Sequence, residues 1–333
     1  MNQIIEKLLE LVNLTQQESR DVMFEIMSGK YDDAQISGFL IALRSKGETS
    51  EEIAGFAQAM RDKMTLIDSV DGAIDMCGTG GDSLGTFNIS TASSLVVAAA
   101  GVPVAKHGNR SMTSQSGSAD VLSALGVDIS LPANRVSECM HQIGIGFMFA
   151  PSLHPAMKYA MGARKSLAVR TVFNLLGPLC NPAGAKRQLL GIFSGDLTYK
   201  IAEVLKKLGS IHALVVNGND GLDEISNTAI TKYAELKPDG SILSGNICVS
   251  DFGIKLSDIQ SLKGGLPKDN AKIITSILNG EKGPRRDIVV INAAAGIMVG
   301  GKADSLSDGI ELARECIDTG LANNILELLS KFK

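Results

Sequence analysis

The chain has 333 residues, of which 44% are hydrophobic and 20% are charged, and its formal net charge is −4 at pH 7. This composition is typical of a globular protein with room for two lobes, and it excludes a disordered or fibrous chain. The mildly acidic, mixed charge disfavours non-specific binding of nucleic acid, so we expect no nucleic-acid partner.

No segment of the sequence indicates export or membrane insertion. Glu6 and Glu10 interrupt the apolar residues at the N-terminus, which excludes a signal-peptide pattern there. The longest apolar run, residues 95–105, is shorter than the about 18 residues of a membrane span. The five cysteines have no CxxC spacing and form no zinc-ligand set with the four histidines. We expect a cytoplasmic protein with reduced thiols and no membrane partner.

Residues 1–64 have the apolar spacing of four amphipathic helices. Thr15 with Glu18, and Thr49 with Glu52, have the spacing of a capping box at the start of the second and fourth helices. The pattern predicts a small all-helical N-terminal domain.

From residue 73 the pattern changes to short apolar strands, each followed by a glycine-rich turn and a helix. This alternation predicts an α/β domain with a mostly parallel sheet flanked by helices. The candidate strands are residues 74–77, 102–105, 147–150, 189–193, 213–216 and 288–291, and residues 236–243 are expected to form a hairpin. Ligands of such sheets bind beyond the carboxyl ends of the strands.

The first predicted strand of this domain is followed directly by Gly78-Thr79-Gly80-Gly81-Asp82. Backbone N–H groups of a glycine-rich loop can hold a phosphate, although a tight strand-to-helix turn explains the glycines equally well. Asn88-Ile89-Ser90-Thr91 then precedes an apolar helix over residues 92–100, whose dipole favours an anion. The alternative is that Ser90 or Thr91 only caps that helix.

Two further polar segments follow strand ends. Residues 106–111 carry two cations on a predicted turn, and with Ser114 and residues 116–120 they add several hydroxyl groups, which indicates a second anion site. Asp223 and Glu224 follow the strand at 213–216, and adjacent carboxylates at a strand end suit Mg²⁺ bridging to phosphate oxygens.

In this order, the segments resemble the anthranilate phosphoribosyltransferases, enzymes of tryptophan biosynthesis that join anthranilate to phosphoribosyl diphosphate (PRPP). The resemblance spans nearly the whole length. It rests on DAQI at 33–36, KGET at 46–49, GTGGD at 78–82, NIST at 88–91, KHGNR at 106–110, SGSAD at 116–120, HPAMK at 154–158, RTVFNLLGPLCNP at 170–182 and DGLDE at 220–224.

The resemblance implies a nucleoside phosphorylase/phosphoribosyltransferase-like fold. A helical domain at residues 1–70, with part of about 160–185 returning to it, would accompany an α/β PRPP-binding domain at residues 71–333. It also implies a homodimer that associates through the helical domain.

The resemblance assigns roles to individual residues. PRPP would be held by Gly78, Gly81, Asp82, Thr86, Asn88, Ser90, Thr91, Lys106, Gly108, Asn109, Arg110, Ser114 and Ser118. Anthranilate would be faced by Gly78, Asn109 and Arg164, with His107, His154 and Pro178 lining its path. Ser90, Asp223 and Glu224 would hold Mg²⁺, as two ions, and no residue is expected to be a general acid or base. The chain departs from the family at Ser83, where a glycine is usual.

Two other functions stay open at this level. A pyrimidine-nucleoside phosphorylase also has a glycine loop beside a lysine, but such chains are longer and carry a third domain. A non-catalytic relative that binds phosphorylated ligands or nucleic acid is the second alternative. The acidic pair at 223–224 and Arg164 argue against it.

Overall fold

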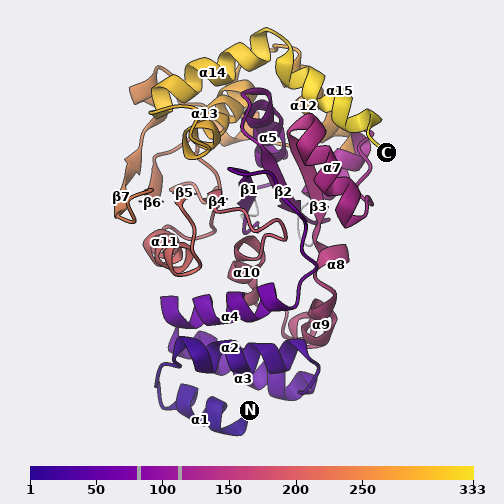
Figure 1. Ribbon diagram of the computed structural model, residues 1–333. Coiled ribbons are helices and arrows are strands. Elements are labelled where there is room, and N and C mark those ends of the chain that lie inside the picture. Colours follow the sequence, from indigo (N-terminus) through magenta and orange to yellow (C-terminus); the bar gives the residue numbers. More distant parts are fainter. Residues whose placement is uncertain (81–83, 112–114) are drawn as a thin grey trace.

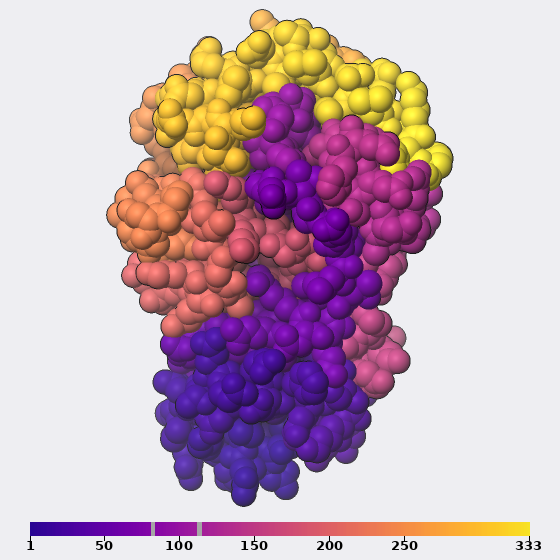
Figure 2. Space-filling view, in the orientation of Figure 1, coloured from indigo at the N-terminus to yellow at the C-terminus, as the bar shows by residue number. Residues whose placement is uncertain are grey.

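The computed structural model describes residues 1–80, 84–111 and 115–333. A helical lobe that contains the N-terminus lies below a larger α/β lobe, and the C-terminus lies at the right edge of the larger lobe (Figure 1). The space-filling view in Figure 2 shows the two lobes in the same orientation. The predicted fold class, a small helical domain joined to a mostly parallel sheet with flanking helices, is confirmed.

The helical lobe begins with four helices, and the last three of them start at a side-chain cap. They are α1 (Asn2–Leu9), α2 (Gln16–Met27), α3 (Asp33–Lys46) and α4 (Ser50–Asp62). The capping boxes predicted at Thr15 and Thr49 are both present, and Asp32 forms a third one that was not predicted. The buried rings of Phe39 and Phe56 meet edge to face, with their centroids 5.8 Å apart, and join α3 to α4.

The sheet of the larger lobe has seven strands in the order β3-β2-β1-β4-β5-β6-β7. The strands are β1 (Ile74–Gly78), β2 (Val104–Gly108), β3 (Ile145–Phe149), β4 (Arg187–Gly191), β5 (His212–Gly218), β6 (Thr231–Leu236) and β7 (Ile242–Ile247). The first five run parallel, and β6 and β7 are antiparallel, which confirms the hairpin predicted at 236–243.

Eleven further α-helices of the described residues connect and cover these strands. They are α5 (Ile89–Ala99), α6 (Ser118–Ala124), α7 (Ala133–Ile143), α8 (Ala150–Leu153), α9 (Lys158–Leu167), α10 (Phe173–Leu176), α11 (Thr198–Lys207), α12 (Pro267–Leu278), α13 (Pro284–Val299), α14 (Leu306–Asp318) and α15 (Leu321–Lys331). The short 3-10 helices are η1 (Pro155–Met157), η2 (Gly177–Leu179), η3 (Gly195–Leu197), η4 (Val249–Phe252) and η5 (Ile259–Leu262). Helices α5 and α13 pack on one face of the sheet, while α11 lies on the other face with the helical lobe below it (Figure 1).

The strands predicted at 147–150 and 189–193 begin two residues earlier in the structure, and two further differences change the interpretation. The strand expected at 102–105 begins two residues later, so Lys106, His107 and Gly108 end β2 instead of forming a turn after it. The strand expected at 288–291 was wrong, because these residues lie inside α13. Helix α13 is buried around almost its whole circumference, and a helix of this kind shows the same unbroken apolar run as a buried strand.

Part of the chain beyond β3 packs against the N-terminal helices. Ala163 of α9 donates its backbone N–H to Asp33 Oδ1 at 3.1 Å. Phe173 and Leu176 of α10 are buried in the same apolar cluster as the residues of α2, α3 and α4. These contacts support the proposed return of residues 160–185 to the helical domain. Within the described residues, no helix is both long and apolar enough to cross a membrane.

Candidate active site

The carboxyl ends of β1, β2, β4 and β5 meet at one edge of the sheet, because these strands run parallel in adjacent positions. The glycine loop follows β1, the KHGNR segment spans the end of β2, and the acidic pair follows β5. Segments far apart in the sequence therefore converge at this edge.

Asp223 contacts the glycine loop directly. Its Oδ2 accepts the backbone N–H of Gly80 at 2.7 Å. A Cβ atom on Gly78 would collide with the Asp223 carboxylate, and one on Gly191 would collide with the Asp223 backbone carbonyl. The absence of side chains at the ends of β1 and β4 is thus what allows this carboxylate to reach the loop. Gly191 was not selected from the sequence, where a glycine inside a predicted apolar strand was the available signal.

Ser90 joins the acidic pair to the buried lysine. It lies in the first turn of α5, and its backbone N–H donates to Glu224 Oε1 at 3.1 Å. Lys106 Nζ lies 3.5 Å from Ser90 Oγ and donates to the carbonyl of Met76 at 2.7 Å. The described part of the glycine loop, Lys106 and residues 223–224 therefore share one site.

Lys106 is 2% exposed, and burial lowers the pKa of its ammonium. The charges of Asp75 and Glu224 act in the opposite direction and favour the protonated form. The Lys106 amine lies beside Ser90 at the N-terminus of α5, where the helix dipole also favours an anion.

His107 points to the opposite face of the sheet from Lys106, because successive side chains of a strand alternate. Its Nε2 lies 3.2 Å from Nε2 of His154, which follows α8. Burial, His154 and Lys106 lower the pKa of His107 to about 3, and burial lowers the pKa of His154 to about 4. Both rings are therefore neutral at neutral pH.

The buried carboxyl group of Asp75 binds the backbone of His107. Asp75 Oδ1 accepts the backbone N–H of His107 at 3.2 Å, and Asp75 is fully buried. Burial raises its pKa, and Asn181, which donates to the carbonyl of Ala105 at 2.9 Å, acts in the opposite direction. Asp75 was also missed from the sequence, where an acidic residue inside an apolar strand was the available signal.

Several predicted PRPP ligands hold the loops around the site together. Asn88 precedes α5 and does not cap it; its amide donates to the carbonyl of Ser116 at 3.0 Å, and its Oδ1 accepts from Asn270 at 2.9 Å. Thr86 forms an isolated antiparallel bridge with Lys263. Thr91 is buried in the first turn of α5, and its hydroxyl has no hydrogen-bond partner among the described residues.

The segment after β2 closes on the start of α6. Ser118 Oγ donates to the carbonyl of Asn109 at 3.3 Å, and a Cβ on Gly108 would collide with the Ser118 hydroxyl. Arg110 is exposed and binds Asp120 at 3.0 Å. Lys106 and Arg110 therefore have different surroundings, one inside the strand and one at the surface.

Arg164 and Pro178 belong to the segment that packs beside the helical lobe. The Arg164 guanidinium lies 5.2 Å from the centroid of the Phe173 ring, and burial lowers its pKa. Pro178 is buried in η2, and its carbonyl accepts from Gln188 at 2.7 Å. The predicted ligands Gly81, Asp82 and Ser114, and the family departure at Ser83, lie outside the described residues.

The oxygen atoms of Asp223, Glu224 and Ser90 fit the ligand preference of Mg²⁺, which takes carboxylates together with water and substrate phosphates. Among the described residues, no three His, Cys, Asp or Glu side chains gather as a complete protein cage. An ion bound here would therefore share its coordination with a ligand or water.

The fold and this site define a two-domain glycosyl transferase. The model of the glycosyl transferase family a/b domain matches residues 70–323, and that of its helical bundle domain matches residues 2–64. An anthranilate phosphoribosyltransferase of Alkaliphilus metalliredigens (strain QYMF) is 52% identical over 332 residues, covering 99% of this chain and 98% of that protein. The chain belongs to the anthranilate phosphoribosyltransferase family.

Solved structures agree in both fold and extent. The crystal structure of the Thermus thermophilus anthranilate phosphoribosyltransferase has a TM-score of 0.92 and 41% identity, covering 99% of this chain and 98% of its own. The Saccharomyces cerevisiae enzyme in complex with PRPP and Mg has a TM-score of 0.89 and 28% identity, covering 98% and 96%. The same yeast enzyme has been solved with 4-fluoroanthranilate, with a TM-score of 0.88 and 27% identity, covering 98% and 96%.

Proposed function

We propose that this protein transfers the phosphoribosyl group of PRPP to the amine of anthranilate, giving N-(5-phosphoribosyl)anthranilate and diphosphate, in tryptophan biosynthesis. The observation that carries the proposal is the position of Ser90, which contacts both Glu224 and Lys106 beside the loop held by Asp223. The yeast relative binds PRPP and Mg in its solved complex.

The donor would lie at the sheet edge. We assign its diphosphate to the backbone of the glycine loop, the N-terminal turn of α5 and Lys106. The described residues around it would be Thr86, Asn88, Thr91, Gly108, Asn109, Arg110 and Ser118. Asp223, Glu224 and Ser90 would hold Mg²⁺, as two ions, which would neutralise the negative charge of the leaving diphosphate.

The acceptor would lie on the side of His107. We assign His107, His154 and Pro178 to the lining of its path, and Arg164 to its carboxylate, which a guanidinium can bind through two hydrogen bonds. Gly78 and Asn109 would complete this side next to the reacting ribose carbon.

In the reaction, the amine nitrogen forms a bond to ribose C1 while the bond from C1 to the diphosphate oxygen breaks, and the diphosphate leaves with the electron pair. The amine proton is released to solvent. The two histidines are weak bases at their lowered pKa values, so catalysis would rest on positioning the reactants and stabilising the leaving group.

A homodimer through the helical domain is part of the proposal. Several large apolar side chains are exposed on this lobe, and exposed apolar surface is where proteins commonly contact each other. They are Leu9 at the end of α1, Leu11 and Val12 just after it, Phe24 on α2 and Ile41 on α3. Sedimentation of the wild type should give the mass of two chains, and Leu9→Glu should shift it toward one. A wild-type mass of one chain would overturn this part.

A cytoplasmic location also belongs to the proposal. All five cysteines are free thiols, as is usual in a reducing compartment.

The test of the activity is direct. Purified protein mixed with anthranilate, PRPP and Mg²⁺ should consume anthranilate, which is followed by loss of its fluorescence. No consumption together with cleavage of a pyrimidine nucleoside in the presence of phosphate would replace this function by that of a phosphorylase.

A further inference from the structure

Residues 261–265, which we call the strap, run along the loop that joins the glycine loop to α5. Phe87 donates its backbone N–H to the carbonyl of Leu262 at 3.1 Å, and Gly264 donates to the carbonyl of Gly85 at 2.9 Å. The bridge between Thr86 and Lys263 lies between these two hydrogen bonds. Every residue from Gly85 to Phe87 is thus paired with the strap.

The strap lies very close to this loop. A Cβ on Gly264 would lie 2.7 Å from the Cα of Phe87, so only glycine permits the approach. Asn270 of α12 donates to Asn88 Oδ1 at 2.9 Å and accepts the N–H of Gly265 at 2.7 Å. A displacement of the strap would therefore move both ends of the segment that leads into Ser90.

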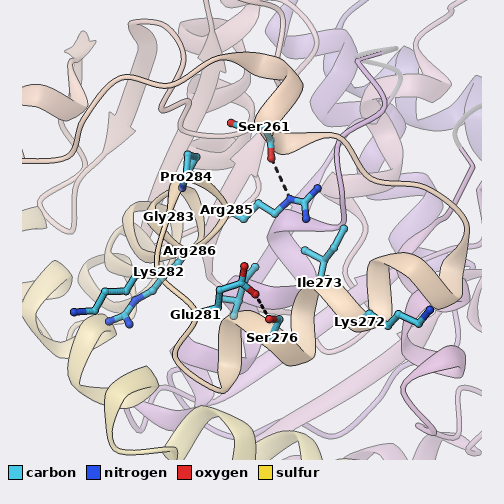
Figure 3. Close-up of a pocket in the computed structure, with 11 residues that line it drawn as sticks. Ser261, Lys272, Ile273, Ser276, Glu281, Lys282, Gly283, Pro284, Arg285 and Arg286 are labelled. Carbon is cyan, nitrogen blue, oxygen red and sulfur yellow. Dashed lines mark hydrogen bonds between the residues drawn. The ribbon is translucent and has the colours of Figure 1, made fainter.

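Arg285 of α13 forms hydrogen bonds with the backbone of the strap. It lies in the first turn of α13, and its guanidinium donates from Nε to the carbonyl of Ser261 at 3.0 Å and from Nη2 to that of Lys263 at 2.9 Å. Figure 3 shows the first of these bonds, with Glu281 turned toward Ser276 instead of toward Arg285. The charge of Arg285 is therefore directed at the two backbone carbonyls that flank Leu262.

The same helix also holds the acidic pair. Asn292 of α13 is fully buried, accepts the N–H of Ile225 at 2.9 Å, and donates to the Ile225 carbonyl at 2.9 Å. Ile225 directly follows Glu224. One buried helix therefore carries two groups: Asn292 binds Ile225, next to the acidic pair, and Arg285 binds the strap.

We propose that Arg285 is a positioning residue for PRPP binding. By binding the strap to α13, it keeps the loop at 84–88 and the start of α5 in position relative to Asp223 and Glu224. The inference rests on the proposed function for its ligand. Arg285 itself lies at the surface cavity drawn in Figure 3, whose volume is about 440 Å³, and it acts only through the strap. Water in this cavity can bind the two carbonyls when the guanidinium is removed, so the fold should survive the change.

Arg286 is the matched control. It lies next to Arg285, is 6% exposed, and binds Asp318 at 2.7 Å and the carbonyl of Gly280 at 3.3 Å, so it makes none of the strap contacts described for Arg285. Removing Arg286 should lower thermal stability without altering the donor site.

The experiment compares Arg285→Ala, Arg285→Lys and Arg286→Ala by hydrogen exchange of the unliganded protein and by steady-state kinetics. Arg285→Ala should speed exchange of the Phe87 and Gly264 amides and raise KM for PRPP about five- to tenfold, with KM for anthranilate changed less than about twofold. Arg285→Lys should show a smaller change in the same direction, because an ammonium cannot span both carbonyls. It carries the test alone if Arg285→Ala does not fold.

Exchange and KM equal to wild type in the Arg285 variants, or equal changes in Arg286→Ala, would overturn the inference. The exchange measurement needs no turnover, so it separates this inference from the proposed function. If Arg285→Ala speeds exchange but the wild type lacks transferase activity, Arg285 still holds the strap, but its role in PRPP binding is refuted. If exchange is unchanged in an active enzyme, the role of Arg285 in holding the strap is refuted and the proposed function stands.

Discussion

Nε2 of His107 and Nε2 of His154 lie 3.2 Å apart across the gap between β2 and the segment after α8. Two ring nitrogens at this distance attract each other only if one donates and the other accepts, so at least one ring must be neutral. Burial and the nearby Lys106 favour the neutral form of His107, and burial favours that of His154. Both rings are therefore neutral at neutral pH, and the pair can form this hydrogen bond.

This pair should make stability depend on pH. Unfolded histidine takes up a proton near pH 6.5, whereas the folded pKa values are about 3 for His107 and about 4 for His154. The unfolded state thus binds more protons below pH 6.5, and the free energy of unfolding should fall by up to about 1.4 kcal/mol per pH unit for each histidine as pH drops toward 4. Urea unfolding between about pH 7 and pH 5 should show this slope. A His107→Asn/His154→Gln double variant should flatten it; an equal slope in that variant would assign the effect to other groups.

Removal of either acidic group should abolish most of the activity. Asp223→Asn and Glu224→Gln keep the size of the side chains that contact Gly80 and Ser90 but remove the charge that suits Mg²⁺. We expect kcat to fall about a hundredfold or more, with an unchanged circular dichroism spectrum. Asp196→Asn is the control, because that side chain is 95% exposed. Wild-type turnover in both acidic-pair variants would refute their metal role.

Gly191→Ala should damage the site through the backbone of Asp223. The added Cβ would collide with the Asp223 carbonyl, so residues 223–224 must shift relative to the glycine loop. A displacement of about 1 Å can cost about a hundredfold in kcat/KM. Gly38→Ala is the control, because its Cβ would make an ordinary contact of 3.6 Å with Ile5 on the helical lobe. Equal kcat/KM for the two variants would contradict the close approach at Gly191.

Arg164→Ala should weaken anthranilate binding selectively. Its guanidinium lies against the Phe173 ring, and we propose that it binds the carboxylate of anthranilate. Loss of a charge-assisted hydrogen bond should raise KM for anthranilate about 10- to 100-fold and leave KM for PRPP nearly unchanged. Lys165→Ala removes the neighbouring exposed charge and should change neither constant. A rise in the PRPP constant alone would move Arg164 to the donor side.

Glu52→Gln should destabilise the helical lobe. The carboxylate is fully buried, pairs with Lys46 at 2.9 Å, and accepts the backbone N–H groups of Leu14 and Thr49. Removing one partner of a buried ion pair typically costs about 3–5 kcal/mol of unfolding free energy. Glu51→Gln breaks a partly exposed pair with Lys207 and should cost less than about 1 kcal/mol. Urea unfolding followed by circular dichroism compares the two variants. An equal loss of unfolding free energy in both would show that the buried Lys46–Glu52 ion pair contributes little to stability.

The sequence alone determined the class of fold and the segments that meet at the site. Capping boxes, glycine turns and apolar spacing are local properties, so Thr15, Thr49 and the strand before Gly78 could be read without neighbours. The domain boundaries and the ligand roles of the individual residues stay predictions. Local spacing could not distinguish the apolar run at 288–291 from a strand, because α13 is buried on nearly all sides.

Only the tertiary structure decided how these segments act together. It brought Glu224 to the N–H of Ser90, turned Lys106 and His107 to opposite faces of one strand, and placed Gly191 against Asp223. These contacts join residues from about 16 to more than 130 positions apart, and they depend on the strand order of the sheet. A strand end reveals where a ligand can bind, but which other strand ends lie beside it is fixed only when the whole sheet has formed.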